Sequence, residues 1–242
     1  MNMKTCTRRK SRGPDKLRAW KITSGVLEHA EGSALIECGR TKVLCAASVE
    51  DRVPQFLKNA GKGWITAEYS MLPRATHTRF PRERGSKIGG RTMEIQRLVG
   101  RSLRAVVDLS QLGERTITID CDVIQADGGT RVAAITGGWV ALRDAVQTLH
   151  GQGSIPRNPL LDSVAAVSVG MLGTTMFLDL DYEEDATADV DMNVIVTGKG
   201  QLVEVQATAE GKPFSLTRMN SLVRLACRGL KEIKKIQEAC ST

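Results

Sequence analysis

Acidic residues are concentrated in one short segment of this chain. Seven of the thirteen residues from Asp179 to Asp191 carry a carboxylate, although the formal net charge of the 242-residue chain is +7. Carboxylates at this density repel one another, and proteins balance them with a bound cation or with protons. Because apolar residues alternate with the first of these carboxylates and a strand is predicted at 191–197, we expect a folded segment rather than an acidic tail. The segment is therefore a candidate metal site.

Two carboxylates are the best candidates for metal ligands. Asp191 is the first residue of the predicted strand, and Asp185 lies in the connection before it, so a turn can bring the two together. Magnesium is commonly held by one or two protein carboxylates, while water and substrate phosphates fill its other positions. The other five are expected in structural or solvent-facing positions: Asp179 and Asp181 on the solvated face of a strand at 175–182, and Glu183, Glu184 and Asp189 in a loop.

Two short sequences elsewhere predict anion binding. Gly89-Gly90-Arg91-Thr92 and Gly128-Gly129-Thr130-Arg131 each place two glycines, an arginine and a threonine where a helix is predicted to begin. Free N–H groups and the helix dipole favour anions there, and arginine adds a planar set of donors for phosphate oxygens. One such turn is equally consistent with an ordinary strand-to-helix connection. Two of them, in a basic chain with a separate carboxylate cluster, favour a phosphate pocket.

Basic residues also gather before and along the first predicted long helix. Residues 74–104 contain eight arginines, and the sequence pI is about 9.2, which favours a polyanionic partner such as RNA. Aromatic residues make up only 4% of the chain, so a base-stacking platform is not predicted. The eight arginines are Arg74, Arg79, Arg82, Arg84, Arg91, Arg97, Arg101 and Arg104.

Several other classes of protein are not supported by the sequence. His29, His77 and His150 are scattered without the spacing of a catalytic triad, and the six cysteines form no CxxC pair or zinc motif. No apolar run approaches the roughly 20 residues that span a bilayer, so we expect a cytoplasmic protein. Residues 1–16 are basic with little to bury and are expected to form a mobile arm, followed by one domain over 17–242.

Hydrophobic periodicity predicts an α+β fold of two similar halves, each with strands followed by a helix. In the second helix of the first half, Gly137 and Gly138 suggest close packing against a neighbouring element. In the first half we expect strands at 33–38, 41–49, 64–72 and 116–123 and helices at 92–109 and 130–150. In the second half we expect strands at 164–169, 175–182, 191–197 and 201–208 and a helix at 216–239.

The segments around these candidate residues closely resemble the ribonuclease PH family of phosphate-dependent 3′-to-5′ exoribonucleases. The resemblance runs from about residue 12 to residue 239. The matching segments are 29–33, 41–45, 63–69, 71–74, 90–98, 120–131, 191–194 and 204–211.

The resemblance implies a role for each group of candidate residues. It implies that the catalytic aspartates, which hold Mg²⁺ or Mn²⁺, are Asp185 and Asp191. The phosphate site would consist of Arg91, Gly129, Thr130 and Arg131. The arginines that contact tRNA would be Arg74, Arg79 and Arg82.

The resemblance also implies an activity, a fold and an assembly. Inorganic phosphate would attack the last phosphodiester of tRNA precursors, and of ribosomal RNA, to release nucleoside diphosphates, and the reverse reaction would add nucleotides. The fold would be a single ribonuclease PH domain, like domain 2 of ribosomal protein S5, with mixed sheets and helices in two halves. The family's assembly is a homohexamer built as a trimer of dimers.

Two alternatives remain open. One is a non-catalytic RNA-binding ring subunit of the exosome type, which the presence of Arg91, Thr130, Arg131 and both candidate metal ligands argues against. The other is a metal-dependent hydrolytic nuclease. The residues alone do not distinguish attack by phosphate from attack by water, and the choice of phosphate depends on the resemblance.

Overall fold

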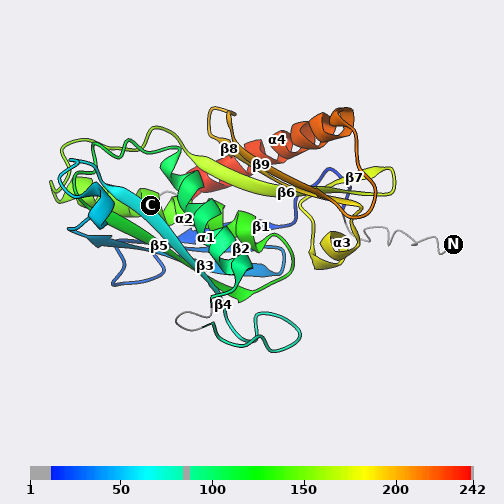
Figure 1. The fold of residues 1–242 in the computed structure, drawn as a ribbon, viewed down its shortest axis with the longest axis horizontal. Coiled ribbons are helices and arrows are strands. Elements are labelled where there is room, and N and C mark those ends of the chain that lie inside the picture. The colour runs from blue at the N-terminus through cyan, green and yellow to red at the C-terminus, as the bar shows by residue number, and fades with distance from the viewer. Residues whose placement is uncertain (1–11, 84–87, 241–242) are drawn as a thin grey trace.

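The chain forms two β-sheets with helices packed against them (Figure 1). The computed structural model describes residues 12–83 and 88–240. The first sheet has five strands in the order β1-β2-β3-β5-β4, and the second has four in the order β7-β6-β8-β9. The predicted α+β fold with two halves is therefore confirmed.

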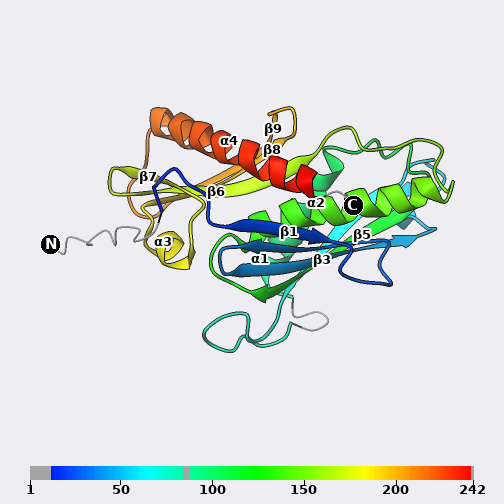
Figure 2. The same ribbon diagram turned by 180° about the vertical axis from the view of Figure 1, so that it is seen from behind.

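The first sheet combines antiparallel and parallel pairing. β1 pairs antiparallel with β2 at one edge (Figure 2), whereas β4 at the other edge pairs parallel with β5. Between residues 117 and 123 of β5 the apolar side chains face the core and Asp120 and Asp122 face the opposite side, which confirms the alternation predicted for a half-buried strand. The strands are β1 (Trp20–Ser24), β2 (Gly32–Cys38), β3 (Thr41–Glu50), β4 (Trp64–Met71) and β5 (Thr116–Gln125), with a short 3₁₀ helix at Gln55–Leu57.

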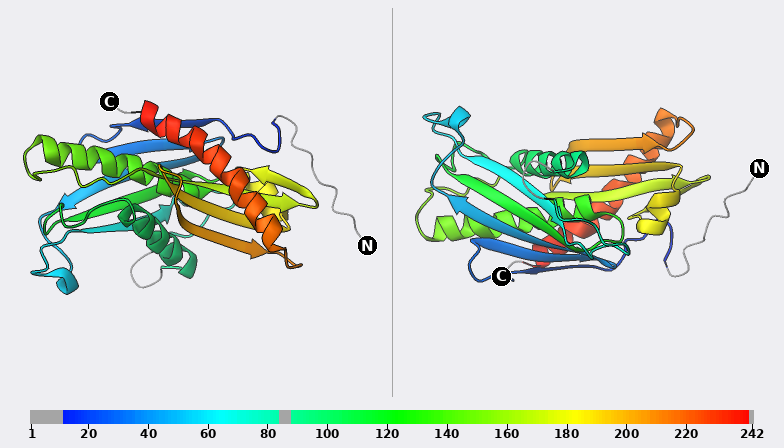
Figure 3. Two further views of the ribbon diagram at one scale, coloured as in Figure 1. Left: turned by 90° about the horizontal axis from the view of Figure 1, so that it is seen from above. Right: turned by 60° about the horizontal axis from the view of Figure 1, so that its bottom comes forward.

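The second sheet is antiparallel throughout. α4 (Leu216–Ala239) lies across its strands, as Figure 3 shows from above, and buries one side against them. The amphipathic pattern of α4, with charged residues on its outer side, explains this position. The strands are β6 (Val164–Leu172), β7 (Thr175–Leu178), β8 (Val190–Thr197) and β9 (Leu202–Ala209).

Helix α2 (Thr130–Gly151) joins the two halves. It contacts β2 and β3 of the first sheet and β6 of the second, and its side chains are buried around most of its circumference. A helix that is apolar on all sides is typical of such a central position. A Cβ atom on Gly137 would lie 2.8 Å from the Ile36 side chain, which confirms the close packing predicted at this glycine.

Two predicted boundaries are wrong by four residues or more. Helix α1 (Gly90–Arg104) ends five residues earlier than expected, because Val106 and Val107 leave it to bond the segment around Leu160. The strand predicted at 175–182 ends at Leu178. The backbone at Asp179 has a φ of +58°, and Asp181 then begins the short helix α3 (Tyr182–Thr187). β1 was not predicted, because Ile22 is its single buried side chain.

The end of the predicted N-terminal arm contacts the second half. Residues 1–11 lie outside the described residues, whereas Arg12 bonds the carbonyl oxygen of Asp179 and the carboxylate of Glu184. No helix in the described part of the chain is both long enough and apolar enough to span a membrane.

Candidate active site

The two halves meet at a cavity of about 440 Å³. It takes residues from the two predicted anion-binding helix starts and from the acidic segment. The structure thus brings together groups that lie up to about a hundred residues apart in the sequence. The candidate site residues that line the cavity are Arg91, Gly129, Thr130, Arg131, Asp185 and Asp191.

The turn before α2 depends on two glycines. Gly128 and Gly129 have φ values of +73° and +68°, a region that favours glycine, and Gly129 is the N-cap of α2. A Cβ atom on Gly128 would lie 2.7 Å from the Leu180 carbonyl oxygen, so the turn packs directly against the backbone of the acidic segment. The free N–H groups at this helix start are therefore fixed next to the carboxylates.

Polar side chains orient the residues that follow the turn. The Tyr69 hydroxyl donates to Thr130 Oγ1 at 2.8 Å, and Arg131 Nη1 donates to Gln206 Oε1 at 3.0 Å. Arg131 also forms an ion pair with Glu94, 3.2 Å from Nη1 to Oε2. Arg91, the second residue of α1, is exposed and lines the same cavity. The cavity is thus lined by one exposed arginine, Arg91, and by one that Glu94 and Gln206 hold in place, Arg131.

The two candidate metal ligands come from adjacent elements. Asp185 lies on α3 and Asp191 on β8, and neither carboxylate forms an ion pair with a basic side chain within residues 12–83 and 88–240. Desolvation raises the pKa of Asp185, and the charge of Asp191 raises it further. Desolvation likewise raises the pKa of Asp191, with a further contribution from Glu210.

A divalent cation would relieve this repulsion. The described residues bring no three His, Cys, Asp or Glu side chains into a metal-binding group, so the protein would supply these two carboxylates alone. Such a donor set fits Mg²⁺, which keeps several water ligands and binds substrate phosphates.

Three of the other carboxylates have structural roles, so the solvated strand face predicted for Asp179 and Asp181 and the loop predicted for Glu184 are wrong. Asp179 is fully buried and accepts hydrogen bonds from Arg18 and Trp20. Asp181 and Glu184 form a capping box, in which each side chain accepts from the other residue's backbone N–H at the start of α3. The Asp189 carboxylate accepts from the Gly173 N–H at 2.6 Å, whereas Glu183 is exposed as predicted.

The predicted RNA-binding arginines do not line the cavity. Arg74, Arg79 and Arg82 are exposed on the connection between β4 and α1, part of which projects from the body of the molecule (Figure 1). Phe80 and Pro81, which lie between two of them, do line the cavity. Arg79 and Arg82 are thus next in sequence to residues that line the cavity, and the role of all three arginines remains a prediction.

The prediction from sequence missed several residues of the cavity and its supports. Asn193 lies on the same face of β8 as Asp191, and Glu94 lies one helical turn after Arg91, so both could have been found from periodicity. Gln206 pairs with Asn193 across β8 and β9, a register that sequence spacing does not give. Tyr69 likewise reaches Thr130 only through the packing of the first half.

Comparisons with known proteins agree with this architecture. Residues 16–147 match the 3′ exoribonuclease family, domain 1, and residues 162–229 match the 3′ exoribonuclease family, domain 2.

Solved structures of similar fold cover nearly the whole chain. Rrp46 from rice (Oryza sativa) has a TM-score of 0.77 at 20% identity, over 96% of this chain and 98% of that one. An Archaeoglobus fulgidus exosome with RNA bound to its active site has a TM-score of 0.78 at 23% identity, over 93% and 90%. An archaeal exosome core has a TM-score of 0.74 at 22% identity, over 93% and 89%.

At 20–23% identity the solved structures show only a shared fold, whereas the matches to the two family domains show which family the chain belongs to. The first match alone covers more than half of the chain, and the second follows it in the family's own order. The chain therefore belongs to the 3′ exoribonuclease family, that is, to the ribonuclease PH family.

Proposed function

We propose that this protein is a phosphate-dependent 3′-to-5′ exoribonuclease that trims tRNA precursors. The observation that carries the proposal is the single cavity in which Arg91 and the start of α2 lie with Asp185 and Asp191. Arg91 and the start of α2 would supply a site for an anion, and the two aspartates would supply ligands for a cation. A site with both suits transfer between two phosphate groups.

The reaction needs no nucleophilic side chain. An oxygen of inorganic phosphate forms a bond to the phosphorus of the last phosphodiester, the bond to the 3′-oxygen of the preceding nucleotide breaks, and that oxygen takes a proton. The products are a nucleoside diphosphate and an RNA shortened by one nucleotide. Arg91, Arg131 and the N–H groups at Gly129 and Thr130 would bind and orient the attacking phosphate.

Asp185 and Asp191 would hold a divalent cation near the attacked phosphate. When bound, this ion neutralises negative charge on the reacting phosphoryl group and on the leaving oxygen. The Glu94 and Gln206 side chains hold Arg131 toward the same cavity. These residues thus orient the arginine before any substrate arrives.

A second function is favoured by the solved structures: a non-catalytic, RNA-binding subunit of an exosome-type ring. Two of the solved structures described above are of exosomes. For this function the cavity would bind the RNA end without turnover. A ring assembly, whether this or a homohexamer, would place the exposed arginines of several copies around one RNA path.

The two functions are distinguished by incubating the protein with 3′-extended tRNA and Mg²⁺, with and without phosphate, and identifying the released nucleotides by chromatography. We expect nucleoside diphosphates that require phosphate. Tight RNA binding with no released nucleotide would support the second function, and nucleoside monophosphates without a phosphate requirement would indicate hydrolysis.

A further inference from the structure

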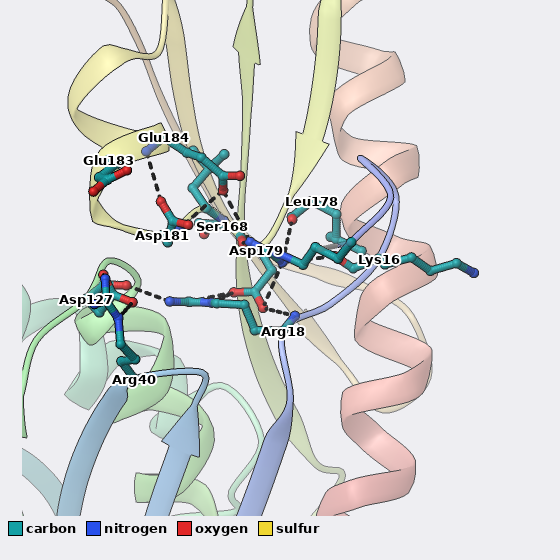
Figure 4. Close-up of polar contacts among 12 residues, drawn as sticks. Lys16, Arg18, Arg40, Asp127, Ser168, Leu178, Asp179, Asp181, Glu183 and Glu184 are labelled. Atoms are coloured by element: carbon teal, nitrogen blue, oxygen red, sulfur yellow. Dashed lines mark hydrogen bonds and ion pairs between the residues drawn. The ribbon is translucent and has the colours of Figure 1, made fainter. Parts of the chain in front are cut away.

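Arg18 connects the two halves of the candidate site. It lies just before β1, and its guanidinium donates from Nη1 to the Asp127 carbonyl oxygen at 2.6 Å and from Nη2 to Asp179 Oδ1 at 2.7 Å (Figure 4). Asp127 directly precedes the glycine turn of the anion site, and Asp179 begins the acidic segment. The side chains of Arg18 and Asp179 are only 7% and 0% exposed, so both contacts are shielded from water.

The Asp179 carboxylate is held from several directions. Its Oδ1 also accepts from Arg18 Nε at 3.1 Å, and its Oδ2 accepts from the Arg18 backbone N–H and from Trp20 Nε1, each at 2.8 Å. The backbone of Asp179 adopts a positive φ, which brings the chain from β7 toward α3. The position of the acidic segment is thereby tied to residues 18 and 20.

The anion-binding turn is fixed in the same way on its other side. Arg40 Nε and Nη2 donate to the two carboxylate oxygens of Asp127, each at 3.0 Å. Thr41 Oγ1 accepts from the Asp127 N–H at 2.8 Å and donates to the Gly128 carbonyl oxygen at 2.7 Å. Arg40 and Thr41 belong to the first half and hold the turn in place there. The Arg18 guanidinium then links this turn, at Asp127, to Asp179 in the second half.

A buried ion pair is a weak source of net stability, because the cost of removing both charges from water offsets most of their attraction. Its hydrogen bonds are nevertheless strongly directional, and an arginine can bond two acceptors at once in a fixed plane. Asp127 is three residues before Thr130, and Asp179 is six residues before Asp185. A shift of the bridge that Arg18 forms between Asp127 and Asp179 would therefore change the distance between the phosphate site and the metal ligands.

We propose that Arg18 and Asp179 form a positioning pair for the reaction: their bridge to Asp127 sets the spacing between the bound phosphate and the two catalytic aspartates. This inference rests on the proposed function. Neither residue lines the cavity, so the pair acts through the turn at 127–130 and the segment at 179–191.

The test uses Arg18→Lys in the full-length chain. Lysine keeps the charge next to Asp179 but does not span both acceptors, so we expect the KM for phosphate to rise and kcat to fall, by about 10- to 100-fold in kcat/KM. The Kd for RNA should stay within about twofold of wild type, because the exposed arginines are unchanged. Trp20→Phe, which removes one hydrogen bond to Asp179 and keeps an aromatic ring, should give a smaller effect of the same sign.

Arg143→Lys is the matched control. Arg143 is also a buried guanidinium that pairs with a carboxylate, on Asp144, and bonds a backbone carbonyl, on Gln237. It lies about 20 Å along α2 from Thr130. This variant should lose stability in the same way as Arg18→Lys but keep the KM for phosphate and kcat.

Binding of inorganic phosphate to the RNA-free protein, measured by calorimetry, separates this proposal from the proposed function. Weaker phosphate binding in Arg18→Lys than in Arg143→Lys supports the positioning pair, whether or not the wild-type protein is active. Failure of the wild-type protein to release nucleoside diphosphates would contradict only the proposed function. Equal phosphate binding and equal KM in the two variants would overturn the positioning pair, including in a fully active enzyme.

Discussion

At the scale of single residues, neighbouring carboxylates have different roles because they face different groups. Asp179 faces a buried guanidinium and an indole N–H, whereas Asp191 faces a cavity that it shares with another carboxylate. The sequence pattern selects Asp191 as a candidate ligand but gives no sign of the buried contacts of Asp179. The alternation of apolar and acidic residues around Asp179 predicts a solvated position, but its partner Arg18 lies 161 residues away in the sequence. A prediction from local pattern has no access to such a contact.

The metal-binding role predicts a sharp contrast within the acidic segment. Asp191→Asn should lower kcat by about a hundredfold or more, since a correctly held metal contributes several kcal/mol of transition-state stabilisation. Binding of RNA should remain largely intact. Glu183→Gln is the matched control, because Glu183 is exposed in the same segment and does not line the cavity. Similar losses in the two variants, measured by steady-state kinetics, would contradict the assignment.

The buried position of Asp179 predicts a pH dependence of stability. Burial alone would raise the pKa of Asp179, but the Arg18 charge and the hydrogen bonds from Arg18 and Trp20 outweigh it, and the net pKa lies below its ordinary value. The resulting stabilisation is present above the pKa of an unfolded aspartate, about 3.9, and is lost as pH falls through the lower pKa of the folded protein.

This dependence can be measured with Asp179→Asn, whose side chain does not titrate. The variant should be less stable than wild type at pH 7, and the difference in free energy of unfolding should shrink as the pH falls below about 4. Urea denaturation at several pH values measures the difference. A difference that stays constant or grows toward low pH would show that the ionised carboxylate is not the stabilising form.

At the scale of elements, hydrophobic periodicity located the regular helices and strands well. It did not predict where some of them end or how the chain connects them. β5 and α2 were located correctly from their apolar spacing, as were both glycine turns. The end of α1 was misplaced, because Val106 and Val107 continue the apolar pattern but pack outside the helix. The strand at β7 was extended too far, because a positive φ at a non-glycine residue is not visible in a pattern of alternation. The six candidate residues that line the cavity were each selected from the sequence, whereas their neighbours across the sheet were not.

The turn at Gly128 predicts a specific cost for an added methyl group. Gly128→Ala would place Cβ 2.7 Å from the Leu180 carbonyl oxygen at a positive φ, whereas Gly173→Ala would meet nothing within 4 Å at a similar φ of +62°. The control should lose about 1–2 kcal/mol of unfolding free energy from backbone strain alone. Gly128→Ala should lose about 1–3 kcal/mol more, from overpacking against the Leu180 carbonyl oxygen. Equal losses by urea denaturation would contradict the close contact between the two halves.

At the scale of the whole molecule, the site exists only because the two halves are held together. α2 packs against both sheets, and the glycine turn at its N-terminal end contacts the backbone of the acidic segment. The exposed arginines lie outside the cavity, on the connection between β4 and α1. The region proposed to bind the RNA backbone is therefore separate from the region proposed for chemistry.

This separation predicts how RNA binding responds to salt. Each phosphate contact with single-stranded RNA contributes about 0.7 to the slope of log affinity against log salt concentration. Arg79→Ala should reduce that slope by about this amount and weaken RNA binding, with a smaller effect on trimming of very short RNA. Arg228→Ala, which removes an exposed arginine from α4, is the control and should leave the slope unchanged. Fluorescence anisotropy over a range of salt concentrations measures the RNA affinity and its salt slope. Equal slopes for wild type, Arg79→Ala and Arg228→Ala would contradict a role in RNA binding for the connection between β4 and α1.

The central claim is that a phosphate ion bound at Arg91 and at the start of α2 is the nucleophile. The most direct measurement incubates the protein with 3′-extended RNA, Mg²⁺ and ³²P-labelled inorganic phosphate, and then separates the released nucleotides. We expect one labelled phosphate in every nucleoside diphosphate released, and release of labelled product by Asp191→Asn that is slower by about a hundredfold or more. Release of unlabelled nucleoside monophosphates by the wild-type protein would contradict the claim.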